Sequence, residues 1–213
     1  MRSIEIEEHV KNLGLTSRQR AIVVGLLLGD GHLETQNGGR TYRLKVEHGI
    51  AQKEYVDWLY QEFKDWIRTP PKERTKSSFG KPIVSYSFTT YSGGALRFYA
   101  QQFYQARKKI MPKLIGKILD PQAIAIWYMD DGSWKSDKHR TYIIHTLGYN
   151  RDELERVQKV FAKNFGIAVG IHSQYNGLRL CIAAESAGSF KSLIEPYVIP
   201  SMSYKLGEQM PKE

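Results

Sequence analysis

The stretch that decides the fold is Val23-Val24-Gly25-Leu26-Leu27-Leu28-Gly29-Asp30-Gly31, an apolar run of helical character that ends in an acid and a glycine. The pattern returns as Ile124-Ala125-Ile126-Trp127-Tyr128-Met129-Asp130-Asp131-Gly132. A carboxylate at this end of a helix faces the negative end of the helix dipole, so helix stability does not favour it. Carboxylate and helix-end carbonyl oxygens are, however, the ligands that hard divalent cations prefer. The repeat therefore predicts metal binding at Asp30 and Asp131, and a single composite site if a pseudo-twofold axis relates the two copies.

The residues that follow each copy predict the same order of elements. In the first half we expect a helix over 17–28 opened by a capping box at 16–19, a hairpin of 32–36 with 41–47, a helix over 53–67, a second hairpin with a strand at 83–88, and a helix over 93–105. In the second half we expect a strand at 141–145, a helix over 151–165, a hairpin of 167–172 with 178–182, and a helix over 187–195. Each half is therefore αββαββα, and the fold class is α+β.

The repeat also predicts the domain organisation. We expect an N-terminal extension at 1–16, a first half at 17–105, a connecting segment at 106–121 and a second half at 122–213.

The charge of the chain favours a polyanionic partner. The 213 residues carry a net charge of +9, and residues 61–117 hold twelve Lys or Arg but only three acids. Nucleic acid is the better candidate, because the chain lacks a long basic amphipathic helix with a bulky apolar face and any apolar run of about 18 residues. The single cysteine, Cys181, and the acidic N-terminus without a signal-peptide pattern favour a reducing intracellular compartment, cytoplasm or organelle matrix, over secretion.

Several kinds of catalytic site are excluded because the chain lacks the sequence motifs that they require. The histidines have no pair at metal-ligand spacing, which with one cysteine argues against zinc. The chain also has no Walker loop, dinucleotide fingerprint or serine-triad signature.

Two lysines recur in register with the two acids. Lys109 and Lys205 each lie just beyond the last predicted helix of their half, where a cation could stabilise charge that develops on a phosphodiester. Alternatively, Lys109 is only a member of the basic run 107–109.

Polar residues of the predicted strands and turns are candidates for reading DNA, since a two-stranded ribbon fits the major groove. Taken singly, each is more often an ordinary exposed side chain. The candidates are Gln36, Arg40, Arg43, Lys45, Arg74, Lys76, Lys81, Lys135, His139, Arg140, His172, Gln174, Tyr175, Asn176 and Arg179.

These residues resemble the LAGLIDADG homing endonucleases with two motifs in one chain. Residues 23–31 and 124–132 correspond to the name-giving motifs, and residues 39–42, 69–74 and 199–206 resemble further stretches of a family member encoded by a mitochondrial intron. The similarity runs from Leu15 to Leu206. One departure lies in the second motif, where Ile126 replaces the usual glycine.

The resemblance implies a monomer with two pseudo-symmetric halves, a β-saddle over double-stranded DNA, and motif helices at the interface. It implies cleavage of both strands of a long asymmetric site, leaving short 3′ overhangs. Asp30 and Asp131 would bind the catalytic Mg²⁺, or Mn²⁺, with Ca²⁺ as a non-catalytic substitute. The carbonyls of Gly29 and Asp130 would be further metal ligands, and Lys109 and Lys205 would be the active-site lysines.

A second function class is a non-cleaving binder of the same fold, either an intron RNA maturase or a DNA-binding regulator. Such members often lose the motif acids. Retention of both acids and both lysines in this chain favours the nuclease.

Overall fold

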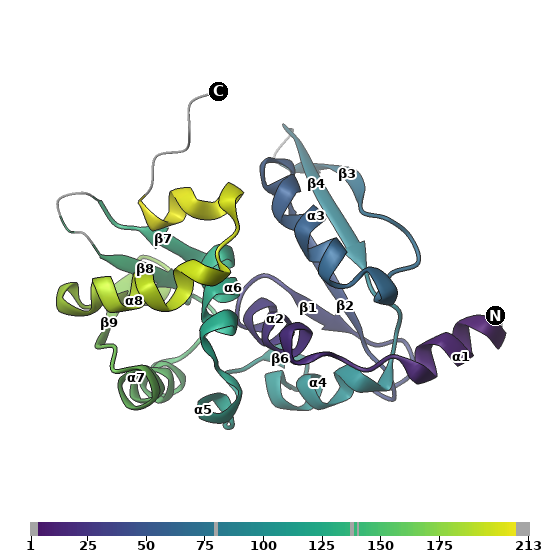
Figure 1. Ribbon diagram of the computed structural model, residues 1–213, viewed down its shortest axis with the longest axis horizontal. Helices are drawn as coiled ribbons and strands as arrows, with labels where there is room; N and C mark the ends of the chain where they lie inside the picture. The colour runs from purple at the N-terminus through teal and green to yellow at the C-terminus, as the bar shows by residue number, and fades with distance from the viewer. Residues whose placement is uncertain (1–3, 79–80, 137–138, 140, 208–213) are drawn as a thin grey trace. The chain divides into compact units, whose positions relative to one another are not determined.

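The computed structural model describes residues 4–78, 81–136, 139 and 141–207, and these form two compact units (Figure 1). The first unit comprises residues 4–20 and 30–101, and the second comprises residues 21–29 and 102–207. The helix α2 (Ser17–Leu28) is divided, since its first turn belongs to the first unit and the remainder to the second. Among the helices of the described residues, none is long and apolar enough to cross a membrane.

The first unit is a four-stranded antiparallel sheet covered by one main helix. Its elements are α1 (Ile4–Asn12), β1 (His32–Glu34), β2 (Arg43–Gly49), α3 (Lys53–Glu62), β3 (Lys72–Ser78), β4 (Lys81–Thr89) and most of α4 (Arg97–Phe103), with 3₁₀ turns at Ile50–Gln52, Lys64–Trp66 and Gly94–Leu96. The strand order is β1-β2-β4-β3. Strand β2 alternates as its sequence predicts, with Leu44 and Val46 buried beneath α3. The predicted capping box is confirmed, because Thr16 and Gln19 exchange hydrogen bonds of 3.0 and 3.1 Å.

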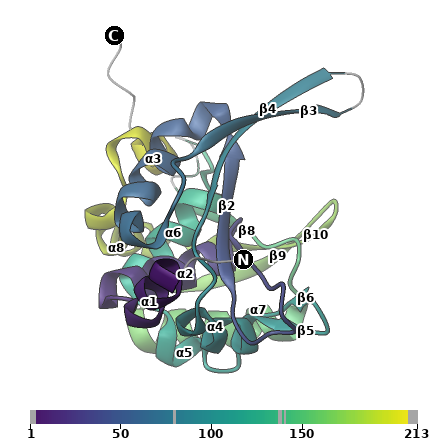
Figure 2. The same ribbon diagram turned by 90° about the vertical axis from the view of Figure 1, so that its right-hand side faces the viewer.

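Strands β3 and β4 extend beyond the rest of their sheet. Only the second half of β4, from Ser85 to Thr89, pairs with β2, whereas β3 accompanies β4 along its length. Figure 2 shows the outer part as a two-stranded ribbon. A two-stranded β-ribbon is one of the elements that the major groove of DNA admits.

The second unit repeats this topology in its own sheet. Its elements are β5 (Tyr104–Gln105), β6 (Lys108–Lys109), α5 (Ile115–Ile118), α6 (Pro121–Asp131), β7 (Gly132–Trp134), β8 (Tyr142–His145), α7 (Arg151–Phe165), β9 (Val169–Gln174), β10 (Gly177–Ile182) and α8 (Ala187–Ile194), with 3₁₀ turns at Ala184–Ser186, Glu195–Tyr197 and Pro200–Leu206. The order β7-β8-β10-β9 matches that of the first sheet element for element. The αββαββα order predicted for each half is therefore confirmed.

Two helices are shorter than predicted. The helix expected over 53–67 ends at Glu62, because Phe63 leaves the helical conformation and a 3₁₀ turn follows. That turn buries Trp66 in the core of the first unit. The helix expected over 93–105 also begins with a 3₁₀ turn and stops at Phe103. The chain then turns through the small β5–β6 hairpin, which lacks the glycine that usually marks such a turn.

Candidate active site and nucleic-acid interface

The C-terminal part of α2 packs against α6 at very short range within the second unit. A Cβ added to Gly25 would lie 2.4 Å from the Cβ of Ile126 and 2.6 Å from the carbonyl oxygen of Ala123. A Cβ added to Gly29 would lie 2.6 Å from the Cβ of Asp130. Because Gly25 and Gly29 have no side chain, they leave room for the larger residues Ile126 and Asp130 of α6. The unusual Ile126 is accommodated by Gly25, its contact across the helix pair.

The two contacts join equivalent positions of the repeated motif. Gly25 is the third residue of the first motif, as Ile126 is of the second, and Gly29 and Asp130 are each the seventh. A contact between equivalent positions is the signature of a local twofold relation. The acids Asp30 and Asp131 are the next residues in the chain after the second contact pair.

Both predicted lysines bind the carbonyls at the ends of the motif helices. The Nζ atom of Lys109 donates to the carbonyl oxygen of Gly29 at 2.6 Å, and that of Lys205 donates to the carbonyl of Asp130 at 2.9 Å. Lys205 also donates to the carbonyl of Met129. A cation is favoured at this end of a helix, because the last carbonyls carry partial negative charge. The structure therefore brings both lysines to equivalent carbonyls of the repeat.

Each lysine is held by local structure that its surroundings explain. Lys109 lies on β6, and the turn before it places Ala106 and Arg107 in the left-handed region, with φ of 46° and 67°. Lys205 lies in the 3₁₀ turn Pro200–Leu206, and its own carbonyl accepts a hydrogen bond of 2.6 Å from the Tyr128 hydroxyl on α6. Tyr128 and Lys205 thus tie this turn and the end of α6 to each other.

Asp131 opens onto a hollow of about 280 Å³ in the second unit. Lys109, Gly29 and His145 also line this hollow. The indole nitrogen of Trp127 donates to Oδ2 of Asp131 at 3.2 Å, which orients the carboxylate. The lining of the hollow therefore includes an acid, a basic residue and Gly29 from the end of the first motif. The hard oxygen donors fit a divalent cation.

Asp30 belongs to the first unit, where a buried histidine accompanies it. The Asp30 side chain is 52% exposed, and its Oδ2 lies 3.6 Å from Nδ1 of His48. His48 follows Leu44 and Val46 in the inward-facing register of β2, and its ring packs against Tyr55 with centroids 5.1 Å apart. No sequence motif marks His48, although the alternation of β2 could have indicated a buried imidazole.

Two further residues near the motif helices were not predicted from the sequence. The hydroxyl of Tyr149 donates to the carbonyl of Leu28 at 3.1 Å, and burial raises its pKa. His145 contacts Ser133 and Gln174 at 3.2 and 3.3 Å and reaches the hollow beside Asp131. Neither residue belongs to a sequence motif, so only the folded chain identifies them.

The predicted DNA-reading residues of the first half share one face of the first sheet. Arg43, Lys45, Arg74 and Lys76 project from the face opposite α3, as the strand pairing requires. Two acids lie among them. Glu34 accepts two hydrogen bonds from Arg43, and Glu47 lies 2.8 Å from both Lys45 and Lys76.

These ion pairs keep both acids charged. Hydrogen bonds from Lys45 and Lys76 lower the pKa of Glu47 to about 2. Burial would raise the pKa of Glu34, but hydrogen bonds from Arg43 and His32 outweigh it and hold this pKa below its ordinary value. The face therefore carries fixed negative as well as positive charge at neutral pH.

The other candidates of the first half lie at the edges of this face. Gln36 and Arg40 are exposed in the segment between β1 and β2. Lys81 begins β4, and its side chain lies outside the described part of the structure.

In the second sheet two of the candidates, Arg179 and His172, form a row with His145 across three strands. The strand register places His145, Arg179 and His172 directly opposite one another on β8, β10 and β9. Tyr175 and Asn176 form the tip of the β9–β10 hairpin, where Tyr175 is fully exposed. Lys135 and His139 are exposed after β7, and Arg140 lies outside the described residues.

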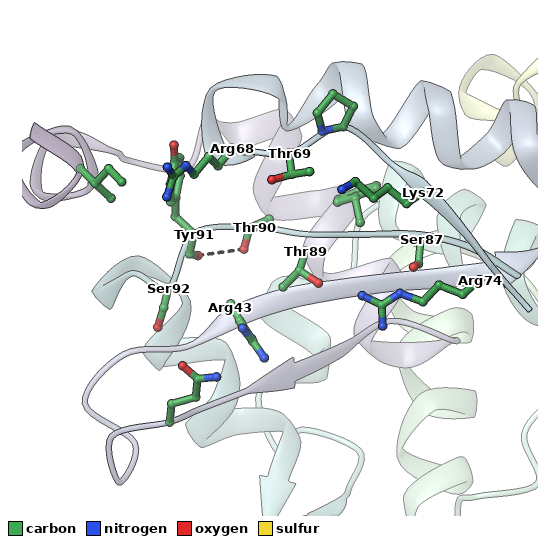
Figure 3. A pocket seen from close by; sticks show the side chains of 14 residues that line it. Arg43, Arg68, Thr69, Lys72, Arg74, Ser87, Thr89, Thr90, Tyr91 and Ser92 are labelled. Carbon is green, nitrogen blue, oxygen red and sulfur yellow. Dashed lines mark hydrogen bonds between the residues drawn. The ribbon is translucent and has the colours of Figure 1, made fainter. Parts of the chain in front are cut away.

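The extension α1 is held against the first unit. The His9 ring contacts the carbonyl of Asp65 at 2.8 Å and packs edge-on against Tyr91, with ring centroids 5.6 Å apart. Ile6 lines a second hollow, of about 380 Å³, next to Arg43 and Arg68 (Figure 3). The extension, whose role the sequence left open, therefore borders the polar face of the first sheet.

Comparison with known proteins agrees with this architecture. Residues 20–190 match the model of the LAGLIDADG DNA endonuclease family. The chain is 29% identical to the DNA endonuclease I-ChuI of Chlamydomonas applanata, over 92% of this chain and 97% of that one. It is 28% identical to the cytochrome b mRNA maturase bI2 of Debaryomyces hansenii, over 93% of this chain and 77% of that one. The solved structure of the homing endonuclease I-WcaI bound to its DNA recognition sequence has the same fold, with a TM-score of 0.90 at 23% identity, covering 96% of this chain and 93% of that one.

Proposed function

Because the chain belongs to the LAGLIDADG DNA endonuclease family, we propose that it is a site-specific homing endonuclease that hydrolyses both strands of a long asymmetric DNA target and leaves short 3′ overhangs. The observation that carries the proposal is the pair of equivalent lysine–carbonyl contacts at the ends of the two motif helices. Each contact lies directly before one of the two acids. We further propose that residues 17–105 and 122–213 are the two halves and residues 106–121 connect them.

Asp30 and Asp131 would hold divalent cations, Mg²⁺ or Mn²⁺, with Ca²⁺ as a substitute that does not support cleavage. The carbonyls of Gly29 and Asp130 are suitable additional ligands. A bound divalent cation lowers the pKa of water and offsets charge on the phosphodiester oxygens. The donor chemistry of the Asp131 hollow fits such an ion, since Asp131 and Gly29 both line it and carboxylate and carbonyl oxygens are hard ligands.

The residues of the chain itself prepare this chemistry. Trp127 orients the Asp131 carboxylate through its indole hydrogen bond. The ammonium groups of Lys109 and Lys205 are positioned to offset negative charge that increases on the phosphate oxygens during water attack. A group preorganised for this purpose needs no reorientation during the reaction.

A cleavage selection tests the proposal. A plasmid library with randomised sites, incubated with Mg²⁺, should yield linearised members that share one long sequence. Asp131→Asn should abolish linearisation of the recovered target and weaken Ca²⁺ binding measured by calorimetry. The matched control is Asp152→Asn, which changes an exposed acid in the first turn of α7. Normal cleavage by the Asp131 variant would refute the assigned chemistry.

RNA binding is the second candidate function, because the Debaryomyces hansenii relative is named a maturase. Retention of both motif acids supports the nuclease instead. Tight binding of intron RNA, together with no DNA cleavage in the selection, would reverse this order.

A further inference from the structure

The cations on the polar face of the first sheet are of two kinds. Arg43, Lys45 and Lys76 each lie within 2.8 Å of a carboxylate oxygen of Glu34 or Glu47. Three others are exposed, and among the described residues they form no ion pair with an acid: Arg68, Lys72 and Arg74. The first group is compensated by neighbouring negative charge, whereas the second group is not.

The uncompensated cations converge on the hollow of about 380 Å³ (Figure 3). Figure 3 shows Arg68, Thr69 and Lys72 along one side, and Arg43 and Arg74 on the other. Hydroxyl groups of Ser87 and Thr89 also line it, and its described lining contains no acid. Guanidinium, ammonium and hydroxyl groups around an open hollow are the donors that bind phosphate oxygens.

The compensated cations are poorer ligands for phosphate. A phosphate that approached Lys45 or Lys76 would also approach the ionised carboxylate of Glu47, and the repulsion would offset much of the attraction. An uncharged base edge suffers no such repulsion. The ion pair also holds each side chain in one direction, which suits specific hydrogen bonding more than charge neutralisation.

We propose that this hollow binds backbone phosphates of duplex DNA through Arg68, Lys72 and Arg74, while Lys45 and Lys76, which are paired with Glu47 outside the lining of the hollow, face base edges. The inference rests on the proposed function and assigns different DNA contacts to the two groups of cations. Arg68 and Lys72 become DNA ligands, and Arg74 changes from a predicted base reader to a phosphate ligand. These three residues then supply affinity that depends on salt but not on sequence.

The salt dependence of binding tests this division. The probe is a fluorescein-labelled DNA duplex of arbitrary sequence, about 25 base pairs long and titrated at several KCl concentrations, because non-specific affinity comes from phosphate contacts. For the double variant Arg68→Gln/Lys72→Gln, the slope of log K against log salt should become shallower by about 1.8, at about 0.9 per lost contact. The control Lys159→Gln/Lys163→Gln removes the same charge from exposed positions of α7 and should retain the wild-type slope.

Further variants keep the test decisive. Arg68→Lys retains the charge and should retain the wild-type slope; a shallower slope would mean that the positive charge at this position does not set it, which would overturn the assignment. Lys45→Gln should weaken binding to the selected target more than to arbitrary DNA. Equal slopes for the test and control doubles would overturn the proposal, as would a change seen only with duplex RNA.

Failure of the inference is distinguishable from failure of the proposed function. If the wild-type protein binds and cleaves a selected target but the two double variants have equal slopes, only the phosphate assignment is wrong. If the wild-type protein binds no duplex DNA and the selection yields no target, the proposed function itself is wrong.

Discussion

The contact between α2 and α6 makes a sharp prediction about Gly25. In Gly25→Ala the new methyl group would lie 2.4 Å from the Ile126 Cβ and 2.6 Å from the Ala123 carbonyl oxygen, whereas carbon atoms normally approach to about 3.5 Å. Backbone lies on one side of the methyl group, so a rotamer change cannot relieve the clash. The two helices must separate locally by about 1 Å to restore that contact distance.

The expected cost follows from the burial of both helices. Residues 21–28 of α2 and 123–130 of α6 are all buried, so separation disturbs packing along the whole contact. Overpacking of this kind costs about 1–3 kcal/mol. The better helix propensity of alanine returns only about 1 kcal/mol. We therefore expect a net loss of up to about 2 kcal/mol, which lowers Tm by up to roughly 8 °C in a chain of this size.

Calorimetric melting measures the effect, with Gly188→Ala as the matched control. Gly188 lies in α8 with open space where a Cβ would stand, so alanine there should raise Tm slightly. The double variant Gly25→Ala/Ile126→Gly moves the small residue from α2 to α6. Its loss of unfolding free energy should be at least about 1 kcal/mol smaller than the sum of the losses in the two single variants. If Gly25→Ala is as stable as Gly188→Ala, or if the two changes are additive, the proposed close contact is refuted.

Four further changes test individual interactions. Lys205→Met should reduce cleavage of a selected target by about 10²-fold or more, since a preorganised charge is lost; a variant at the wild-type rate would remove Lys205 from the chemistry. Because the pKa of Glu47 is lowered to about 2, its contribution to stability is complete above about pH 4.5 and is lost as the pH falls toward 2. Glu47→Gln should therefore lower the free energy of unfolding, measured by urea titration at pH 7, by about 1 kcal/mol after discounting for solvent exposure, and the difference from wild type should vanish near pH 2. Tyr149→Phe leaves the buried carbonyl of Leu28 without its donor and should lower the free energy of unfolding by about 1–3 kcal/mol. The control Tyr175→Phe changes a fully exposed residue and should leave stability unchanged, so equal urea midpoints for the two variants would contradict this hydrogen bond. Arg107→Gly places glycine at a position with φ of 67° and should raise Tm by relieving about 1 kcal/mol of backbone strain, whereas a lower Tm would show that the turn is not strained.

The order of elements was predictable from local sequence because helix and strand periodicities, caps and turns act over short distances. The helix α7 (Arg151–Phe165) has the predicted bounds, since Asn150 and Glu153 form a capping box and Gly166 ends the helix in the left-handed region. The helix after Gln52 was overestimated, because burial of Trp66 favours a 3₁₀ turn that no local pattern indicates.

The candidate site was predictable only where its residues repeat. The acids, the carbonyls before them and the two lysines recur in matching positions, so the sequence alone could pair them. His48, His145 and Tyr149 carry no such signal, because their roles depend on neighbours that are distant in the chain.

The sequence by itself determined that the chain has two equivalent αββαββα halves and that an acid lies at the end of the motif helix in each half. It also determined that the chain is basic. Only the tertiary structure decided how the motif helices contact, because that depends on Gly25 making room for Ile126. It also decided which cations are compensated by acids, since strand register brings Glu47 between Lys45 and Lys76 and leaves Arg68 and Lys72 without a carboxylate among the described residues. Periodicity follows from the backbone alone, whereas close contact and charge compensation depend on which distant side chains the fold brings together.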